Sequence, residues 1–330
     1  MVGELVADSE QQPKQVDQSL FTVLVAFSAN LLIAIAKSIA AAVTSSASML
    51  AEAAHSWADT GNEIFLLVAE RRSDRGRDSR HPMGFGREAY VWSMFAAFGL
   101  FTAGAVVSIW HGIQQLIEPE EASNFLVPYI VLAISFVLEG ISFTQAMRQA
   151  RRLAAARNRG VTNFVLNTSN PTLRAVFAED AAALIGITIA AIGVSLHQIT
   201  GSPTPDAIGS ILIGVLLGVI AIFLIDRNRR FLVGEVVRPE VRQRVLRGLL
   251  ERPDIDRITY LHLEYVGPDR LYLVASIDMA GDDVEPSLAV RLRRVERELE
   301  RLEYIEEAVL TLATPDEVSL TPLDGSRRRF

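Results

Sequence analysis

Six long apolar runs dominate this 330-residue chain, and each is about as long as a helix that crosses a lipid bilayer. A helix needs about 20 mainly apolar residues to cross the hydrocarbon core of a membrane. The runs cover residues 20–43, 48–68, 89–110, 125–146, 173–196 and 206–225. We therefore predict a polytopic α-helical membrane protein with six transmembrane helices. Because residues 1–18 are hydrophilic, we expect a hydrophilic N-terminal tail and no cleavable signal peptide.

The arginine content of the connections between these runs alternates, and this alternation predicts the orientation in the membrane. Three segments are rich in Arg: residues 70–88, 147–160 and 226–231. The connections on the other side contain no Lys or Arg: residues 43–48, 117–124 and 197–205. By the positive-inside rule, both termini and the Arg-rich segments lie in the cytoplasm. We expect a multi-pass protein of the inner (plasma) membrane of a bacterium.

The overall composition excludes several classes of function. The net charge of −7 does not suggest nucleic-acid binding. The chain has no cysteine, which removes disulfides, thiolate metal sites and cysteine nucleophiles.

After Arg230 the chain changes from a membrane pattern to a soluble one. A helix is predicted over 238–253, followed by alternating strands at 256–266 and 270–280 that are joined at Gly267-Pro268-Asp269, a hairpin signal. Ser287 can cap a second helix, and the last strand covers 305–313. The predicted order is α-β-β-α-β, with each helix shielding one face of a small sheet.

This order divides the chain into five predicted parts. They are a tail (1–18), a six-span transport domain (19–226), a linker (227–237), a cytosolic α+β ferredoxin-like dimerisation domain (238–315) and a mobile C-terminal tail (316–330). A sheet this small has a thin core, so dimerisation would bury its remaining apolar surface.

The second run carries polar residues that a simple membrane anchor would not need. Glu52, His55, Asp59 and Asn62 are spaced 3, 4 and 3 apart, which places them along one stripe of a helix. A charged side chain at the centre of a membrane helix costs about 2.5–3.5 kcal/mol on insertion scales. We expect this stripe to face a protein interior or a wet cavity.

His55 and Asp59 stand at i and i+4, so both can contact one metal ion. The fifth run adds Glu179 and Asp180, which are about 100° apart on a helix, so at most one is expected to point straight at a shared site. One imidazole with two or three carboxylates suits Zn²⁺, Co²⁺, Fe²⁺ or Mn²⁺ rather than Cu⁺.

Less specific interpretations of these residues stay open. The His55–Asp59 pair can be a polar clamp between helices, and Glu179 can be a packing or gating acid rather than a ligand. Glu139 in the fourth run is expected to be an interhelical hydrogen-bond partner.

Residues 30–63, "NLLIAIAKSIAAAVTSSASMLAEAAHSWADTGNE", followed by "HPMGFGRE" at 81–88, resemble the cation diffusion facilitator family of divalent-metal/proton antiporters. The resemblance covers roughly residues 20–315. It implies that His55 and Asp59 are the transport pair of the second span, and that Asp180 is the aspartate of the fifth span.

The chain departs from the pattern of that family at several positions. Val176 stands where a His or Asp is common, so the resemblance implies a missing ligand that Glu179 or a water replaces. Phe85 removes a ligand from the loop site, which leaves His81 and Asp78. The "ED" pair and "RNRRFLVGE" look more like the divergent branch that includes mitochondrial-type zinc exporters.

The cytosolic part also lacks the metal-binding histidines of the family. Their positions hold residues such as Thr259 and Leu312, which leaves His262 alone. We interpret this part as a dimerisation module without its metal sensor.

The resemblance implies a homodimeric, proton-coupled antiporter in the lipid bilayer that exports a divalent metal as substrate and needs no resident cofactor. Zn²⁺ leads, and Mn²⁺, Fe²⁺ and Co²⁺ stay open. The alternatives are a transport-inactive metal sensor or scaffold on the same fold, and a membrane-embedded metal hydrolase.

Overall fold

The computed structural model describes residues 20–119, 124–157, 159–281 and 284–322, with side chains from residue 27 on. The described chain forms two units. The first unit contains the described residues 20–71 and 89–229. The second unit contains Arg72–Glu88 and the described chain from Arg230 on. The predicted tail 1–18, and the part of the predicted tail 316–330 from residue 323, lie outside the described residues.

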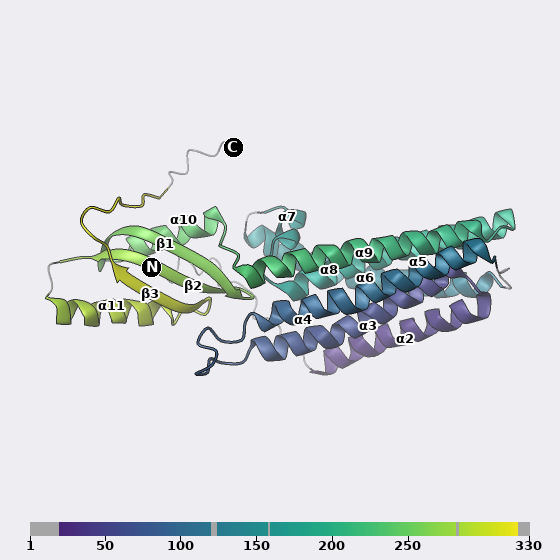
Figure 1. Cartoon of the computed structure of the whole chain (residues 1–330), viewed down its shortest axis with the longest axis horizontal. Coiled ribbons are helices and arrows are strands. Elements are labelled where there is room, and N and C mark those ends of the chain that lie inside the picture. Colours follow the sequence, from purple (N-terminus) through teal and green to yellow (C-terminus); the bar gives the residue numbers. More distant parts are fainter. Residues whose placement is uncertain (1–19, 120–123, 158, 282–283, 323–330) are drawn as a thin grey trace. The chain divides into compact units, whose positions relative to one another are not determined.

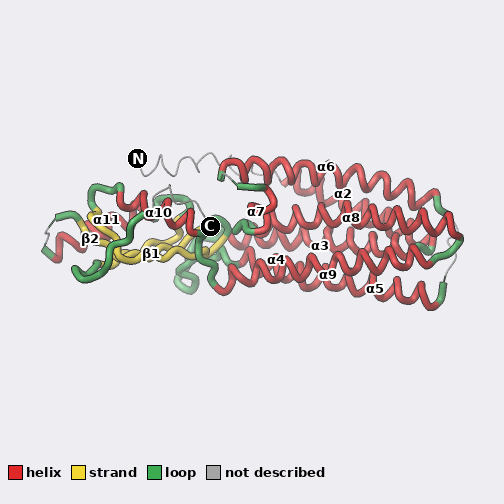
Figure 2. The backbone as a smooth tube through the Cα atoms, turned by 90° about the horizontal axis from the view of Figure 1, so that it is seen from above, coloured by secondary structure: helices red, strands yellow, loops and turns green. Residues whose placement is uncertain are grey.

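The first unit is built of long helices that run side by side (Figures 1 and 2). Their bounds are α2 (Leu20–Thr44), α3 (Ala47–Ser73), α4 (Glu88–Ala96), the π-helical turn η1 (Ala97–Phe101), α5 (Thr102–Ile117), α6 (Leu126–Ala156), α7 (Val161–Leu166), α8 (Pro171–Thr200) and α9 (Thr204–Val233). All six apolar runs are thus helical, the third as the continuous rod α4–η1–α5. The short α7 was not predicted.

Five of these rods are long and apolar enough to cross a membrane: α2, α4–η1–α5, α6, α8 and α9. The remaining long helix, α3, contains the polar stripe around His55 and Asp59, which lowers its hydropathy. The described structure is therefore a helical membrane-type protein with five candidate apolar spans. Helix α9 continues to Val233 and so enters the predicted linker 227–237.

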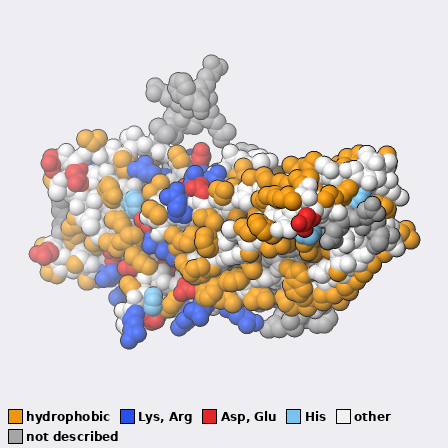
Figure 3. Space-filling view, turned by 45° about the vertical axis from the view of Figure 1, so that its right-hand side comes forward, with side chains coloured by type: hydrophobic (Ala, Val, Ile, Leu, Met, Phe, Trp, Pro, Cys, Tyr) orange, Lys and Arg blue, Asp and Glu red, His pale blue; other side chains and the backbone are white. Residues whose placement is uncertain are grey.

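The helical unit exposes apolar side chains and buries small or polar ones. Hydrophobic side chains predominate on its visible outer surface (Figure 3). Leu32, Phe98 and Ile222 are each about two-thirds exposed or more, at 66%, 68% and 71%. In contrast, Lys37 and Glu52 are fully buried. This distribution is typical of a surface solvated by lipid and an interior that holds the polar chemistry.

Glycines let helices approach closely at two places in this unit. A Cβ on Gly112 of α5 would lie 2.8 Å from the carbonyl oxygen of Ala207 on α9, and one on Gly214 of α9 would lie 2.9 Å from that of Ala105. A Cβ on Gly61 of α3 would lie 2.8 Å from Leu100 in η1. The small residues thus bring α5 to α9, and α3 to the π-helical turn.

The second unit contains a three-stranded sheet and two helices. Its elements are α10 (Pro239–Leu250), β1 (Ile255–Gly267), β2 (Arg270–Met279), α11 (Glu285–Leu299) and β3 (Ile305–Leu312). The predicted order α-β-β-α-β is correct. The sheet has the order β1-β2-β3, with β1 antiparallel and β3 parallel to β2. The hairpin turns at Pro268-Asp269, where Asp269 has a positive φ of 55°.

Two details of this unit differ from the prediction. Ser287 is not the cap of α11, because the helix begins at Glu285 after Val284, and Pro286 occupies its first turn. The two helices also do not shield separate faces. Alternate strand residues such as Leu273 and Ala275 share one buried cluster with residues of both α10 and α11, whereas Tyr260 on the other face is half-exposed. Both helices therefore cover the same face of the sheet.

Candidate functional site

The predicted stripe of α3 is buried as expected. His55 and Asn62 are each 1% exposed, and the side chain of Asp59 is 14% exposed. The Nε2 atom of His55 lies 3.5 Å from Oδ2 of Asp59, which is an ion-pair distance rather than a hydrogen bond. Neither ring nitrogen of His55, nor Oδ1 of Asp59, has a hydrogen-bond partner in the described part of the chain. Buried polar atoms without a hydrogen-bond partner are costly, and these atoms are chemically able to bind a cation.

The two acids of α8 are both buried, but different helices orient them. Asn62 of α3 donates from Nδ2 to Oε1 of Glu179, across 2.6 Å. Ser142 of α6 donates from Oγ to Oδ2 of Asp180, across 2.9 Å. Glu179 therefore contacts α3, and Asp180 contacts α6. Both carboxylates lie within electrostatic range of Asp59.

Further polar contacts flank these groups along α2 and α3. Lys37 of α2 donates to Oε2 of Glu52 at 2.8 Å and to Oγ of Ser56 at 2.9 Å. Asn30 donates to Oε1 of Glu63 at 2.5 Å. Lys37 therefore neutralises Glu52, one turn before His55.

The structure places these groups around a common interior without assembling a closed coordination shell. Among the described residues, no three His, Asp or Glu side chains are arranged to hold a metal ion. Val176, where the resemblance implies a missing ligand, packs against the hydrophobic core of the helical unit. The site can therefore supply imidazole and carboxylate oxygens to a cation only if they converge on it.

Two buried polar contacts were missed by the sequence interpretation. The carboxylate of Asp206, at the start of α9, accepts two hydrogen bonds. The backbone N–H of Ala47 donates one at 2.7 Å, and the hydroxyl of Ser46 donates the other at 3.0 Å. It thus caps the N-terminus of α3, the helix that carries His55. Asp206 is the first residue of the apolar run 206–225, and nothing in the sequence identifies its partner.

The second missed contact is a buried arginine in the first turn of α8. Arg174 donates to the carbonyl oxygen of Thr168 at 2.9 Å and to Oδ1 of Asn228 on α9 at 2.5 Å. Asn228 in turn donates to Oγ of Ser93 on α4, at 3.0 Å. These hydrogen bonds connect the start of α8 to α9 and α4. They therefore help to position the helix that carries Glu179 and Asp180.

The loop between α3 and α4 belongs to the second unit. Nδ1 of His81 lies 2.9 Å from Oδ1 of Asp78, and the ring of Phe85 stacks on His81 with centroids 4.1 Å apart. The hydrogen bond with His81, followed by backbone N–H donors, holds the pKa of Asp78 below its usual value. The structure thus brings the two remaining loop residues together, and Phe85 packs where the resemblance implies a ligand.

The same loop is anchored to the sheet by charged groups. Glu306 of β3 accepts from Arg77 of the loop at 2.7 Å and from Arg270 at 2.9 Å. Arg87 donates to Glu264 at 2.5 Å, and Oε2 of Glu264 lies 3.5 Å from Nε2 of His262. A Cβ on Gly86 would lie 2.7 Å from the carbonyl oxygen of Val266, so only glycine permits this approach.

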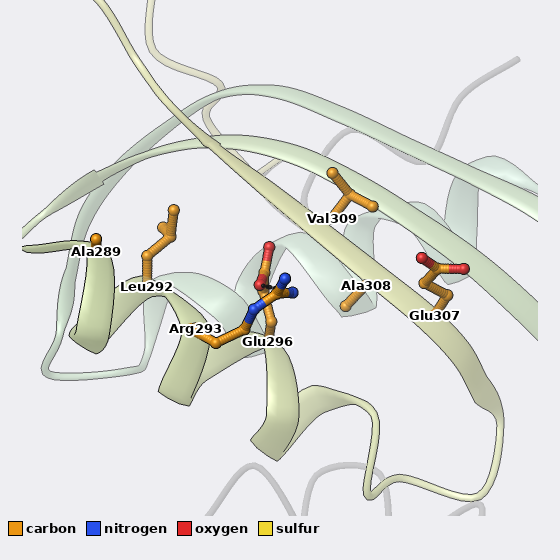
Figure 4. Close-up of a pocket in the computed structure, with 7 residues that line it drawn as sticks. All are labelled: Ala289, Leu292, Arg293, Glu296, Glu307, Ala308 and Val309. Carbon is orange, nitrogen blue, oxygen red and sulfur yellow. Dashed lines mark hydrogen bonds and ion pairs between the residues drawn. The ribbon is translucent and has the colours of Figure 1, made fainter.

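A shallow pocket lies between α11 and β3 in the second unit (Figure 4). It is lined by residues that include Arg293, Glu296 and Val309. Arg293 donates to Glu296 at 2.7 Å, and the other oxygen of Glu296 accepts the backbone N–H of Leu310 at 2.8 Å. Arg293 and Glu296 therefore bond to groups of their own unit, and we assign the pocket no part in the candidate site.

Comparison with known proteins agrees with the arrangement of the helical unit. A family model described as the cation efflux transmembrane domain matches residues 23–233. Metal tolerance protein C4 of Arabidopsis thaliana is 34% identical over 253 residues, which are 77% of this chain and 55% of that protein. The mitochondrial proton-coupled zinc antiporter SLC30A9 of Mus musculus is 35% identical over 259 residues, 78% of this chain and 46% of that protein.

A more distant relative is the magnetosome protein MamB of Paramagnetospirillum magneticum, 22% identical over 247 residues, 74% of this chain and 77% of that protein. The chain spans about half the length of the plant and mouse proteins it matches.

Proposed function

Because the chain belongs to the cation efflux family, the cation diffusion facilitators, we propose that it is a proton-coupled antiporter that exports a divalent cation from the cytoplasm. The observation that carries this proposal is the buried His55–Asp59 pair of α3 beside Glu179 and Asp180 of α8. A His and three carboxylates in a membrane interior are expensive to keep unless they bind something. Members of this family are transporters rather than enzymes, so a hydrolase is not proposed.

Proton coupling follows from the chemistry of the ligands. A metal ion binds neutral imidazole and ionised carboxylates, so its arrival releases protons, and protons arriving from the other side release it. In this mechanism the cation enters from the cytoplasm and meets His55, Asp59, Asp180 and Glu179. Asn62 and Ser142 hold the two acids of α8 in place. Alternating access then exposes the site to the other side of the membrane.

We propose Zn²⁺ as the substrate. The mouse relative is named as a zinc antiporter, and the donor set of imidazole and carboxylate oxygens suits Zn²⁺. Mn²⁺, Fe²⁺ and Co²⁺ fit the same donors and are the competing substrates.

The proposal extends to the organisation of the chain. Helix α3 would be the sixth span, because its polar stripe faces the interior and its length of 27 residues is sufficient. Residues 19–226 would form the transport domain and 227–237 the linker. Residues 238–315 would form a ferredoxin-like domain through which two chains dimerise, with both termini in the cytoplasm. The proposed location is the plasma membrane of a bacterium.

The second candidate is a transport-inactive metal sensor or scaffold. It is favoured by the apolar packing of Val176 and by the unassembled coordination shell among the described residues. A sensor would bind the metal but would not move it.

Metal flux into proteoliposomes under an imposed pH gradient separates the two candidates. The assay compares the wild type with Asp59→Ala, first with Zn²⁺ and then with Mn²⁺. Antiport predicts flux that follows the gradient in the wild type and disappears in Asp59→Ala. Zn²⁺ binding without flux of any divalent cation, in folded protein, would favour the sensor.

A further inference from the structure

Glu139 is a buried acid of the helical unit that the proposed mechanism does not use. It lies near the middle of α6 and is 9% exposed. The sequence predicts an interhelical hydrogen bond for it, yet the described structure contains no hydrogen bond or ion pair of its carboxylate. A nine-tenths buried acid without a partner is costly. An ionised Glu139 would therefore need a partner that the described residues do not supply.

The side of α6 that carries Glu139 faces the candidate site. Ser142 follows three residues later, which places it on the same face of the helix, one turn away. Its Oγ donates to Asp180 at 2.9 Å. Glu139 lies within electrostatic range of Asp59 of α3 and of Glu179 of α8. It therefore lies beside the proposed ligands of both helices.

No protein cation in the described contacts neutralises Glu139. Lys37 lies within electrostatic range of Glu139, but its ammonium group is already held by Glu52 at 2.8 Å and by Ser56 at 2.9 Å. His55 provides an independent sign of a missing ligand, because it is 1% exposed and neither ring nitrogen has a hydrogen-bond partner among the residues that the structure describes. Its Nε2 points toward Asp59, into the same group of acids.

These contacts share one explanation. We propose that Glu139 is a further ligand of the divalent cation, so that α6 binds the ion together with α3 and α8. This inference rests on the proposed function and adds a third helix to its site. An oxygen ligand from α6 compensates for the one that Val176 does not provide, and it links binding of the ion to the position of α6.

Co²⁺ tests this inference directly, because its visible spectrum reports the number and geometry of its ligands. Full-length protein in detergent is titrated with Co²⁺ as wild type, Glu139→Gln and Glu139→Asp, with Glu70→Gln as control. Glu70 is an exposed carboxylate near the end of α3, so its variant removes the same charge outside the site. We expect Glu139→Gln to weaken Co²⁺ binding by at least about tenfold and to alter the spectrum, with no change in Glu70→Gln.

Wild-type affinity and spectrum in folded Glu139→Gln would overturn the inference. If Glu139→Gln does not fold, Glu139→Asp carries the test. Shortening the side chain must then shift the spectrum, and an unchanged spectrum overturns the inference. Zn²⁺ flux of the wild type separates the two proposals. Flux in the wild type with unchanged binding in Glu139→Gln removes only the role of Glu139. Absence of both flux and Co²⁺ binding in the wild type removes the proposed function as well.

Discussion

Asn62 of α3 and Glu179 of α8 are joined by a hydrogen bond of 2.6 Å in the interior of the helical unit. The amide fixes one oxygen of the carboxylate and leaves the other oxygen available. The bond also ties together the two helices that carry His55, Asp59 and Asp180. The position of Glu179 relative to α3 is therefore set by a side chain of the same stripe.

Replacing Glu179 tests whether it substitutes for the ligand missing at Val176. Glu179→Gln keeps a side chain that can bond to Asn62 but removes a charged ligand, so we expect the Kd for Zn²⁺ to rise about 10- to 100-fold in isothermal titration. Asn62→Leu should raise it by a smaller factor, because the carboxylate remains but is no longer held. Wild-type affinity in both variants would make Glu179 a packing acid and leave Glu139 or water as the substitute.

The buried pair of Lys37 and Glu52 predicts a strong effect on stability. Lys37→Met leaves the fully buried Glu52 without its cation and should cost about 3–5 kcal/mol in the free energy of unfolding. The double variant Lys37→Met/Glu52→Gln removes both charges and should recover most of this loss. Thermal unfolding in detergent measures both, and a double variant as unstable as the single one would contradict the prediction.

The close contact of α5 and α9 predicts that added methyl groups are not tolerated there. Gly112→Ala and Gly214→Ala each place a Cβ within 3 Å of a backbone oxygen, at 2.8 Å and 2.9 Å, and should destabilise the protein by about 1–3 kcal/mol. Gly140→Ala in α6 is the matched control, because a Cβ there meets nothing within 4 Å. Alanine favours a helix over glycine, so the control should keep or raise the melting temperature. Equal melting temperatures in all three variants would argue against this close approach.

The anchor between the loop and the sheet predicts a dependence on pH. Burial alone would raise the pKa of Glu306, but the hydrogen bonds from Arg77 and Arg270 outweigh it and hold the pKa below its ordinary value. The stabilising contribution is therefore complete above the ordinary carboxyl range and is lost as the pH falls through the lowered pKa. The protection factor of backbone hydrogen exchange in residues 74–87, which is the intrinsic rate at each pH divided by the observed rate, should be highest at neutral pH and should fall in acid.

Arg77→Ala should lower the protection factor of this loop already at neutral pH. Arg80→Ala is the control, because the described contacts of Arg80 involve only its backbone N–H, which bonds to Asp78. A wild-type protection factor in Arg77→Ala at neutral pH would show that this ion pair does not hold the loop.

Much of the fold was predictable because its signals are local. Apolar runs, alternating strand residues and the Pro268-Asp269 turn each depend on neighbours in the chain, and all of these elements are found. Apart from the cap of α11, where the helix begins at Glu285 and Ser287 is not the cap, the errors concern long-range packing. The helices α10 and α11 cover one face of the sheet, and that choice depends on how distant side chains fill one core.

The sequence by itself determined which residues are chemically unusual: the spacing of His55 and Asp59, and acids such as Asp180 and Glu139 where a membrane favours leucine. It could do so because a charged residue within a long apolar run is recognised from its sequence neighbours alone. Only the tertiary structure decided which helix each acid meets. Glu179 bonds to Asn62, Asp180 to Ser142 and Asp206 to the start of α3, whereas Glu139 has no hydrogen-bond partner among the described residues. These pairings join residues 38 to 159 positions apart, and such contacts are set by the packing of helices and not by any local pattern.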